Sequence, residues 1–228
     1  MNSLFKVVAI LCGVFSLGVN AAFITIDEPG MDTIFAQDSF DGADIDIRVG
    51  AAVEYVDEDL LTMDSASKWS LMSNNHFGSA TTVNFWFLDS ISWCTDTNSN
   101  YVGCGDFPGN DFVVESVYAD SGYNAELLSH ELGHNLGLAH RNDSTNNELM
   151  DPIINGGTTL LTSEVETIFE NASSLVKLDD LGYYIDIIPV LVVAAATATT
   201  AATDVPEPST MMLLAVGLFA IRIRRLIY

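Results

Sequence analysis

The histidines of this chain are concentrated in one short segment, and that segment constrains the fold more than any other feature. Of four histidines, three lie in residues 130–140, which read His-Glu-Leu-Gly-His-Asn-Leu-Gly-Leu-Ala-His. His130 and His134 are four residues apart, so a helix places both imidazoles on one face, one turn apart. Neutral imidazole is a common metal ligand. The segment therefore predicts a helix that carries part of a metal site.

A third ligand is expected from His140. A straight helix would carry this side chain away from the other two imidazoles, but Gly137 stands in between. Glycine adopts positive φ without strain, so the chain can turn there and bring His140 back. Catalytic zinc sites hold three protein ligands and keep one position open. We therefore predict one catalytic Zn²⁺ ion bound by His130, His134 and His140.

A carboxylate follows the first of these ligands directly. Glu131 is expected to reach a water molecule activated by the zinc ion, and to act on it as general base. The alternative interpretation is an amphipathic helix with surface histidines, which would need neither Gly137 nor a third histidine at this spacing. The remaining histidine, His76, receives no role.

Residues 130–152 resemble the signature of the metzincin peptidases, His-Glu-x-x-His-x-x-Gly-x-x-His followed by a turn that carries a methionine. Leu-Met-Asp-Pro over 149–152 is most similar to the matrixin branch. The resemblance implies that Met150 gives the metal site an apolar floor. Pro152 stands where some metzincins have a tyrosine ligand, so no further protein ligand is expected.

The same resemblance implies an α/β (α+β) fold, with a metzincin-like twisted mixed sheet, an active-site helix and a small C-terminal helical part. A substrate would lie extended along an edge strand of the sheet, for which 101–105 is the candidate. Residues 153–157 are expected to shape the pocket for the side chain that follows the scissile bond.

Hydrophobic periodicity also favours an α/β order of elements. Alternating or continuous apolar residues predict the strands, and helical spacing behind capping residues predicts the helices. The expected strands cover 45–49, 82–88 and 112–118, and the expected helices cover 58–73, 125–136 with Asn124 as cap, and a segment that begins at a capping box of Ser163 and Glu166.

Acidic residues dominate the charged composition. The formal net charge is −23, and the chain lacks the basic face that nucleic-acid binding requires. Two acidic clusters raise the alternative of a Ca²⁺ site, although neither has the spacing of a calcium loop. The clusters are Asp41, Asp44 and Asp46, and Asp57, Glu58 and Asp59.

Two cysteines remain once the N-terminal segment with Cys12 is set aside. Cys94 and Cys104 flank a polar stretch, and in an exported protein we expect them to form a disulfide. The alternative is two separate thiols.

The two ends of the chain carry targeting patterns. Residues 1–22 predict a signal peptide that signal peptidase removes. Residues 23–193 form the expected catalytic domain, and 194–204 an Ala/Thr-rich linker. Residues 205–228, Val-Pro-Glu-Pro-Ser-Thr followed by a short hydrophobic segment and a basic tail, resemble the PEP-CTERM sorting signal.

This second resemblance implies recognition by an exosortase-type enzyme and transient membrane association through the C-terminal segment. It also implies delivery to the cell surface or extracellular matrix of a Gram-negative bacterium. A permanent membrane anchor is the alternative.

Together these patterns predict a secreted zinc-dependent endopeptidase that hydrolyses protein or peptide substrates, with Glu131 as general base. The alternative from another class is a surface or biofilm-matrix structural protein that retains the zinc site without significant catalysis. A zinc hydrolase that acts on a non-protein amide is a third reading.

Overall fold

The computed structural model describes residues 25–95, 101–119, 122–141, 147–171 and 174–195. The predicted signal peptide and sorting signal lie outside these residues, as does the linker apart from its first two positions. Within the described part, no helix combines the length and the apolar character that crossing a membrane requires.

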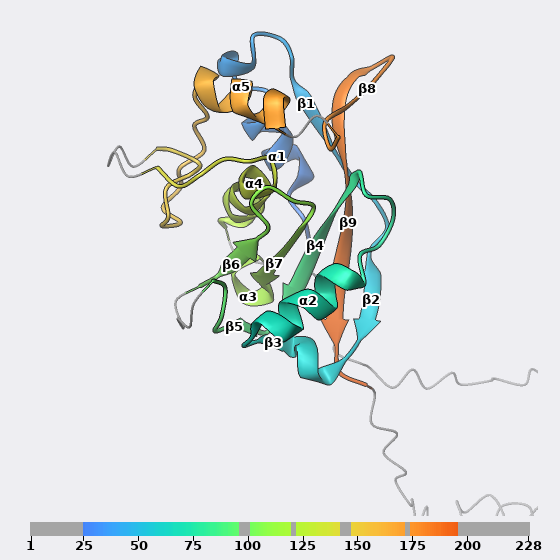
Figure 1. Ribbon diagram of the computed structural model, residues 1–228. Coiled ribbons are helices and arrows are strands. Elements are labelled where there is room, and N and C mark those ends of the chain that lie inside the picture. The colour runs from blue at the N-terminus through green and yellow to red at the C-terminus, as the bar shows by residue number, and fades with distance from the viewer. Residues whose placement is uncertain (1–24, 96–100, 120–121, 142–146, 172–173, 196–228) are drawn as a thin grey trace, which may run out of the picture. The chain divides into compact units, whose positions relative to one another are not determined.

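The α/β class predicted from the sequence is confirmed, because a mixed sheet of seven strands forms the framework (Figure 1). Along the main path the order is β1-β9-β4-β7-β6, with parallel pairing up to β7 and an antiparallel edge strand, β6. These strands span Ile45–Val49 (β1), Gly182–Val193 (β9), Thr82–Leu88 (β4), Asp111–Glu115 (β7) and Gly103–Gly105 (β6). Two more strands pair with β9: β2 (Val53–Val56) in parallel and β8 (Lys177–Asp179) antiparallel.

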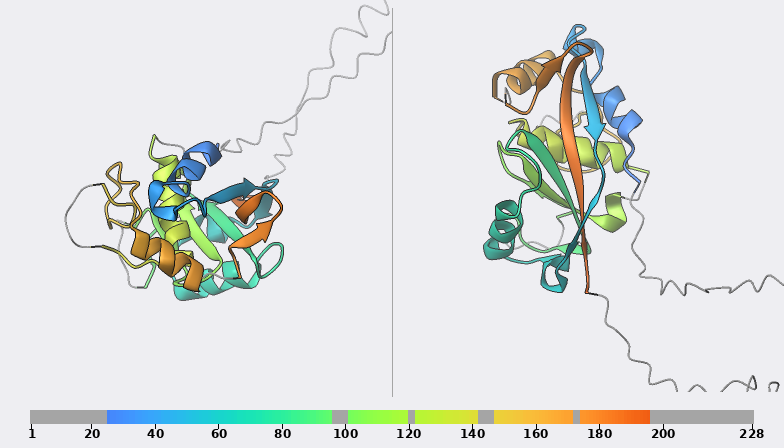
Figure 2. Two further views of the ribbon diagram at one scale, coloured as in Figure 1. Left: turned by 90° about the horizontal axis from the view of Figure 1, so that it is seen from above. Right: turned by 90° about the vertical axis from the view of Figure 1, so that its right-hand side faces the viewer.

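Strand β9 is the longest and runs the length of the sheet (Figure 2). Its partner on one side is β4, and on the other side β1 and then β2. Residues 50–52 interrupt that second side opposite Ile188 and Pro189. Proline has no N–H for a neighbouring strand, and the interruption accommodates it inside a central strand.

Helices cover both faces of the sheet. All seven side chains of β4 are buried, and its apolar side chains divide between two hydrophobic clusters. Val83, Phe85 and Phe87 share one cluster with α1 (Glu28–Ile34), α4 (Asn124–Asn135) and α5 (Thr162–Asn171). Trp86 and Leu88 belong to the other, with a 3₁₀ turn η2 (Glu58–Leu61) and helix α2 (Ala66–Asn74). The smaller elements are η1 (Asp38–Phe40), β3 (Thr62–Met63), β5 (Ser90–Ile91) and α3 (Ser116–Ala119).

The strands predicted at 45–49 and 82–88 are confirmed, but the helix predicted over 58–73 is wrong as one element. The chain forms η2, then β3, and only then α2. The physical reason is pairing, because Thr62 and Met63 bond in parallel to β5 and so leave the helical path. Asp57 caps the start of η2, since its carboxylate accepts the N–H of Asp59 at 3.0 Å.

The strand predicted over 112–118 ends early, at Glu115. There the chain turns into α3, and the side chains of Val117 and Tyr118 are exposed to solvent. The carboxylate of Glu115 accepts the N–H of Ile91 at 2.8 Å, so this residue joins β7 to β5 as the strand ends.

Both predicted helix caps are wrong. Asn124 is the first residue of α4, and its amide oxygen accepts the N–H of Asp27 at 2.8 Å, so it binds the N-terminal segment. For α5, the carboxylate of Glu164 accepts the N–H of Leu161 at 2.7 Å. This carboxylate takes the place expected for Glu166, because the helix begins earlier than the sequence suggests.

The predicted disulfide between Cys94 and Cys104 is present, with Cα atoms 5.8 Å apart. Cys104 lies on β6, so the bond ties the edge strand to the segment that follows β5. The enclosed loop is short, with a sequence separation of 10 residues.

Replacing both Cys94 and Cys104 by serine should lower the free energy of unfolding by about 2–3 kcal/mol, because the unfolded chain loses a constraint on a short loop. Chemical denaturation monitored by Trp fluorescence measures this. The prediction would be contradicted if the double variant had the same denaturation midpoint as the unaltered protein, and if reductant did not change the midpoint of the unaltered protein.

Candidate metal centre

Helix α4 presents the first two predicted ligands. Leu128 and Leu132 on this helix, and Leu136 directly after its end, are fully buried in the core. His130 and Glu131 are also buried, whereas His134, one turn after His130, is partly exposed. Core packing therefore fixes the rotation of the helix and with it the direction of the imidazoles.

The chain turns after α4 as predicted. Gly137 has φ 91°, a conformation that side chains other than glycine rarely adopt. Its N–H donates to the carbonyl of His134 at 2.9 Å, and the N–H of Leu138 donates to the carbonyl of Gly133 at 2.9 Å. These bonds close the helix and return the chain towards its own last turn.

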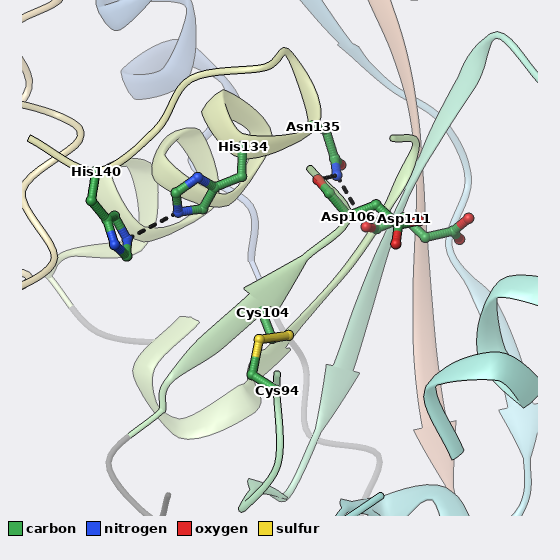
Figure 3. The surroundings of a disulfide bond; sticks show 7 residues. All are labelled: Cys94, Cys104, Asp106, Asp111, His134, Asn135 and His140. Atoms are coloured by element: carbon green, nitrogen blue, oxygen red, sulfur yellow. Dashed lines mark hydrogen bonds between the residues drawn. A yellow bond between two sulfur atoms is a disulfide. The ribbon is translucent and has the colours of Figure 1, made fainter. Parts of the chain in front are cut away.

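The turn brings the three histidines together. The Nε2 atoms of His130 and His140 are 3.2 Å apart, and those of His134 and His140 are 3.1 Å apart. Figure 3 shows the rings of His134 and His140 directed at each other. Three nitrogens at about 2.0–2.1 Å from a tetrahedral zinc ion would be about 3.3 Å apart. The donor set therefore fits zinc in kind and in spacing.

Two backbone carbonyls orient the imidazoles. Nδ1 of His130 donates to the carbonyl of Leu149 at 2.6 Å, and Nδ1 of His134 donates to the carbonyl of Leu138 at 2.8 Å. A proton on Nδ1 leaves the lone pair of a neutral ring on Nε2, the atom that faces the centre. Metal-binding histidines in proteins use such bonds to hold their tautomer and orientation.

The electrostatic environment keeps these rings neutral. Burial, with the neighbouring histidine, lowers the pKa of His130 to about 3, and burial lowers the pKa of His134 to about 4. The pKa of His140 is lowered as well, again by burial. Neutral imidazole is the form that binds a metal ion, so the site does not require deprotonation near neutral pH.

Glu131 lies against the edge strand. A Cβ atom on Gly103 would stand 2.2 Å from its Oε1, so the glycine leaves the space that the carboxylate occupies. Within the described residues its Oε2 is buried without a hydrogen-bond partner. Burial raises the pKa of Glu131 to about 8 in the protein without a metal ion. A nearby cation would favour the charged form and so lower this pKa.

Two cavities of about 530 Å³ each meet at this carboxylate. Both are lined by Tyr101, Gly103, Glu131 and His140. One continues towards Pro152, Ile153 and Ile154, and the other towards Cys104, Phe107 and Ala139. The edge strand β6 thus borders a groove on both sides of the histidines, in the segment expected at 101–105.

Met150 is fully buried and packs against α4. A Cβ atom on Gly133 would stand 2.6 Å from its Sδ, so the helix between the two histidines lies directly on the methionine. The N–H of Arg141 donates to the carbonyl of Met150 at 2.8 Å, which joins the turn to the residue after the third histidine.

The other candidates make local contacts. His76 lies outside the histidine centre, with Nδ1 3.0 Å from the carboxylate of Asp111. In the acidic clusters, Asp46 forms a salt bridge with Arg48 and Asp57 caps the start of η2. Among the described residues, three or more metal-binding side chains converge at His130, His134 and His140 alone.

Some contacts of the site were not predicted. Gly103, within the segment expected as the edge strand, leaves room for Glu131, and the carbonyls of Leu138 and Leu149 accept from the histidines. Glu126 binds the loop that walls one cavity. Backbone acceptors have no side-chain pattern that a sequence could show. The sequence signals that could have located these contacts are Gly103 and the glycine pair 156–157, because a glycine often stands where another group approaches the backbone closely.

Comparison with known protein families gives a match in the C-terminal segment of the chain. Residues 204–225 match the PEP-CTERM protein-sorting motif. No curated protein matches the chain. The motif identifies an exported protein with a C-terminal signal for an exosortase-type sorting enzyme, and it lies outside the domain that carries the histidines.

Zinc binding should depend on the three converging histidines. We expect the full chain, stripped with chelator, to bind one Zn²⁺ ion, and His134→Ala to weaken the affinity at least about 100-fold because one ligand is lost. Competition with a chromophoric chelator measures this. The matched control is His76→Ala, and an equal loss of affinity in that variant would contradict the assignment.

Proposed function

We propose that the protein is an exported zinc-dependent endopeptidase similar to the metzincins. The observation that carries the proposal is the convergence of three imidazole Nε2 atoms beside a buried carboxylate, within a groove along an edge strand. His130, His134 and His140 would hold the ion.

A zinc ion held there would supply Lewis acidity, which lowers the pKa of a water molecule towards about 7 and polarises a peptide carbonyl. Glu131 is the base for this reaction. Its unpartnered Oε2 accepts a proton from water as the water oxygen attacks the peptide carbonyl carbon. As the C–N bond breaks, the carboxyl group returns that proton to the leaving amine.

The groove fits an extended peptide. β6 is the last strand on its side of the described sheet, and a substrate chain can add to it through main-chain hydrogen bonds. The two cavities on either side of Glu131 then receive side chains from both sides of the scissile bond. The cavity bordered by Val102, Leu127 and Ile154 has an apolar lining, so we propose that it accepts an apolar side chain.

Three further features support similarity to the metzincins. The chain turns at Gly137, Met150 packs against the helix between the ligands, and the sheet is mixed with an antiparallel edge strand. Pro152 lines the cavity, and its side chain offers no ligand atom.

The sorting motif supports a location for this activity. We propose cleavage near residues 206–208, after transient membrane association, and delivery to the cell surface or extracellular matrix of a Gram-negative bacterium. The same motif favours the second candidate, a surface or matrix protein that keeps the metal centre without significant catalysis.

Glu131→Gln separates the two candidates. It should abolish zinc-dependent cleavage of a peptide library while one equivalent of zinc stays bound, because the amide cannot accept the proton. Mass-spectrometric mapping of cut sites measures the activity, and the exposed Glu166→Gln on α5 is the matched control. Equal cleavage by Glu131→Gln would overturn the mechanism, and no cleavage by the unaltered protein would favour the second candidate.

Gly103→Ala should lower kcat at least about tenfold with little change in zinc content. The new Cβ would stand 2.2 Å from Oε1 of Glu131 and displace the carboxylate, and small misplacements of catalytic groups are costly. Steady-state kinetics measures the effect. The control is Gly122→Ala, where a Cβ meets open space. If the Gly103→Ala variant kept the wild-type kcat, the space at Gly103 would not be needed to position the Glu131 carboxylate for catalysis.

A further inference from the structure

The loop at 151–157 follows the buried Met150 and forms part of the wall of one cavity. Pro152, Ile153 and Ile154 line this cavity together with His130 and Glu131. Ile153 is 68% exposed, so few contacts of its own hold it in place. Its position therefore depends on how the backbone of the loop is fixed.

Hydrogen bonds to main-chain atoms fix the segments on both sides of the loop. At the start, the carbonyl of Leu149 accepts from His130, and the N–H of Leu149 donates to the carbonyl of Thr159 at 3.0 Å. At the end, the N–H groups of Thr158 and Thr159 donate to the carbonyl of Asn147 at 3.0 and 2.8 Å.

Asp151 accepts the N–H of Ile153 at 3.0 Å within the loop, and the buried carboxylate of Glu126 ties the middle of the loop to α4. Oε1 of Glu126 accepts the N–H groups of Asn155, Gly156 and Gly157 at 2.9, 2.9 and 3.0 Å. Oε2 accepts the N–H of Gly156 as well, at 2.9 Å. Hydrogen bonds to a charged acceptor are stronger than neutral ones, and here three consecutive N–H groups surround one carboxylate.

Two glycines allow the backbone to adopt the conformation that this arrangement requires. Gly156 has φ 92°, and a Cβ on Gly157 would stand 2.4 Å from the carbonyl oxygen of Glu148. Glu126 itself lies one helical turn before His130 on α4. One rigid helix therefore carries two of the converging histidines and the carboxylate that binds the loop at 151–157.

We propose that Glu126 is a positioning residue that sets substrate selectivity, an inference that rests on the proposed peptidase function. By holding the backbone at 155–157, its carboxylate keeps Ile153 and Ile154 against the cavity beside His130. The cavity then favours a large apolar side chain after the scissile bond over a small one.

The test uses the full chain with zinc and two peptides that differ only in having leucine or alanine after a mapped cleavage site. Glu126→Ala should lower the leucine-to-alanine ratio of kcat/KM about tenfold, chiefly through a higher KM for the leucine peptide. Glu126→Gln keeps one carbonyl oxygen as acceptor and should stay within about threefold of the wild-type ratio. Glu166→Ala on α5 is the matched control.

Hydrogen exchange gives a readout that needs no catalysis. In Glu126→Ala the amides of Asn155, Gly156 and Gly157 should exchange at least about tenfold faster, while the amides of α4 near His134 keep their protection. Should Glu126→Ala not fold, Glu126→Asp has to show both changes, because it retains the charge but shortens the side chain by one methylene.

Three outcomes would overturn the inference. The first is an unchanged selectivity ratio, and the second is unchanged exchange at 155–157. The third is an equal loss of kcat/KM on both peptides that Glu126→Gln does not rescue, which indicates a purely structural role. Absence of cleavage by the unaltered protein would instead overturn the proposed function together with this inference, so the two failures are distinguishable.

Discussion

Three imidazole Nε2 atoms converge at one point in this protein, and much of the fold serves to hold them there. The Nε2 atoms lie 3.1 and 3.2 Å apart, a spacing at which neutral rings with facing lone pairs repel unless a cation lies between them. The scaffold opposes this repulsion with the hydrogen bonds that His130 and His134 donate to two backbone carbonyls, with a glycine turn and with a fully buried methionine behind the helix.

Helix α4 combines these constraints because each of its sides has a different partner. Its leucines join the core under the sheet, Glu131 fills the space left by Gly103, and Gly133 lies against Met150. Glu126 reaches the loop beyond the methionine. A change of rotation in this helix would therefore disturb the centre, the edge strand and the cavity wall together.

The sequence predicted the histidine segment well because the information there is local. The spacing of His130 and His134 and the glycine at 137 determine a helix and a turn without reference to distant residues. The strand at 82–88 was equally clear, since a short run rich in aromatic and aliphatic residues indicates a strand buried on both faces.

Predictions failed where long-range pairing decides the structure. Residues 182–193 carried no prediction, yet they form a long interior strand of the sheet. Pro189 argues against a strand in the sequence, and it is tolerated here only because the neighbouring strand is interrupted opposite it. The segment 58–73 has helical spacing but is divided by the pairing of Thr62 and Met63 with β5. The caps at Asn124 and Ser163 were misplaced because tertiary contacts compete with local capping.

The position of β9 has a mechanical consequence. Its last residue, Val193, leads along the chain into the segment that carries the sorting motif. Tension applied through that segment would act along β9, which is bonded in parallel to β4 on one side and to β1 and β2 on the other. Such a load would shear β9 against its neighbouring strands on both sides at once. The hydrogen bonds to those strands would share the load and would have to break together. A protein held by its C-terminal segment would thus be held through its most extensively paired strand.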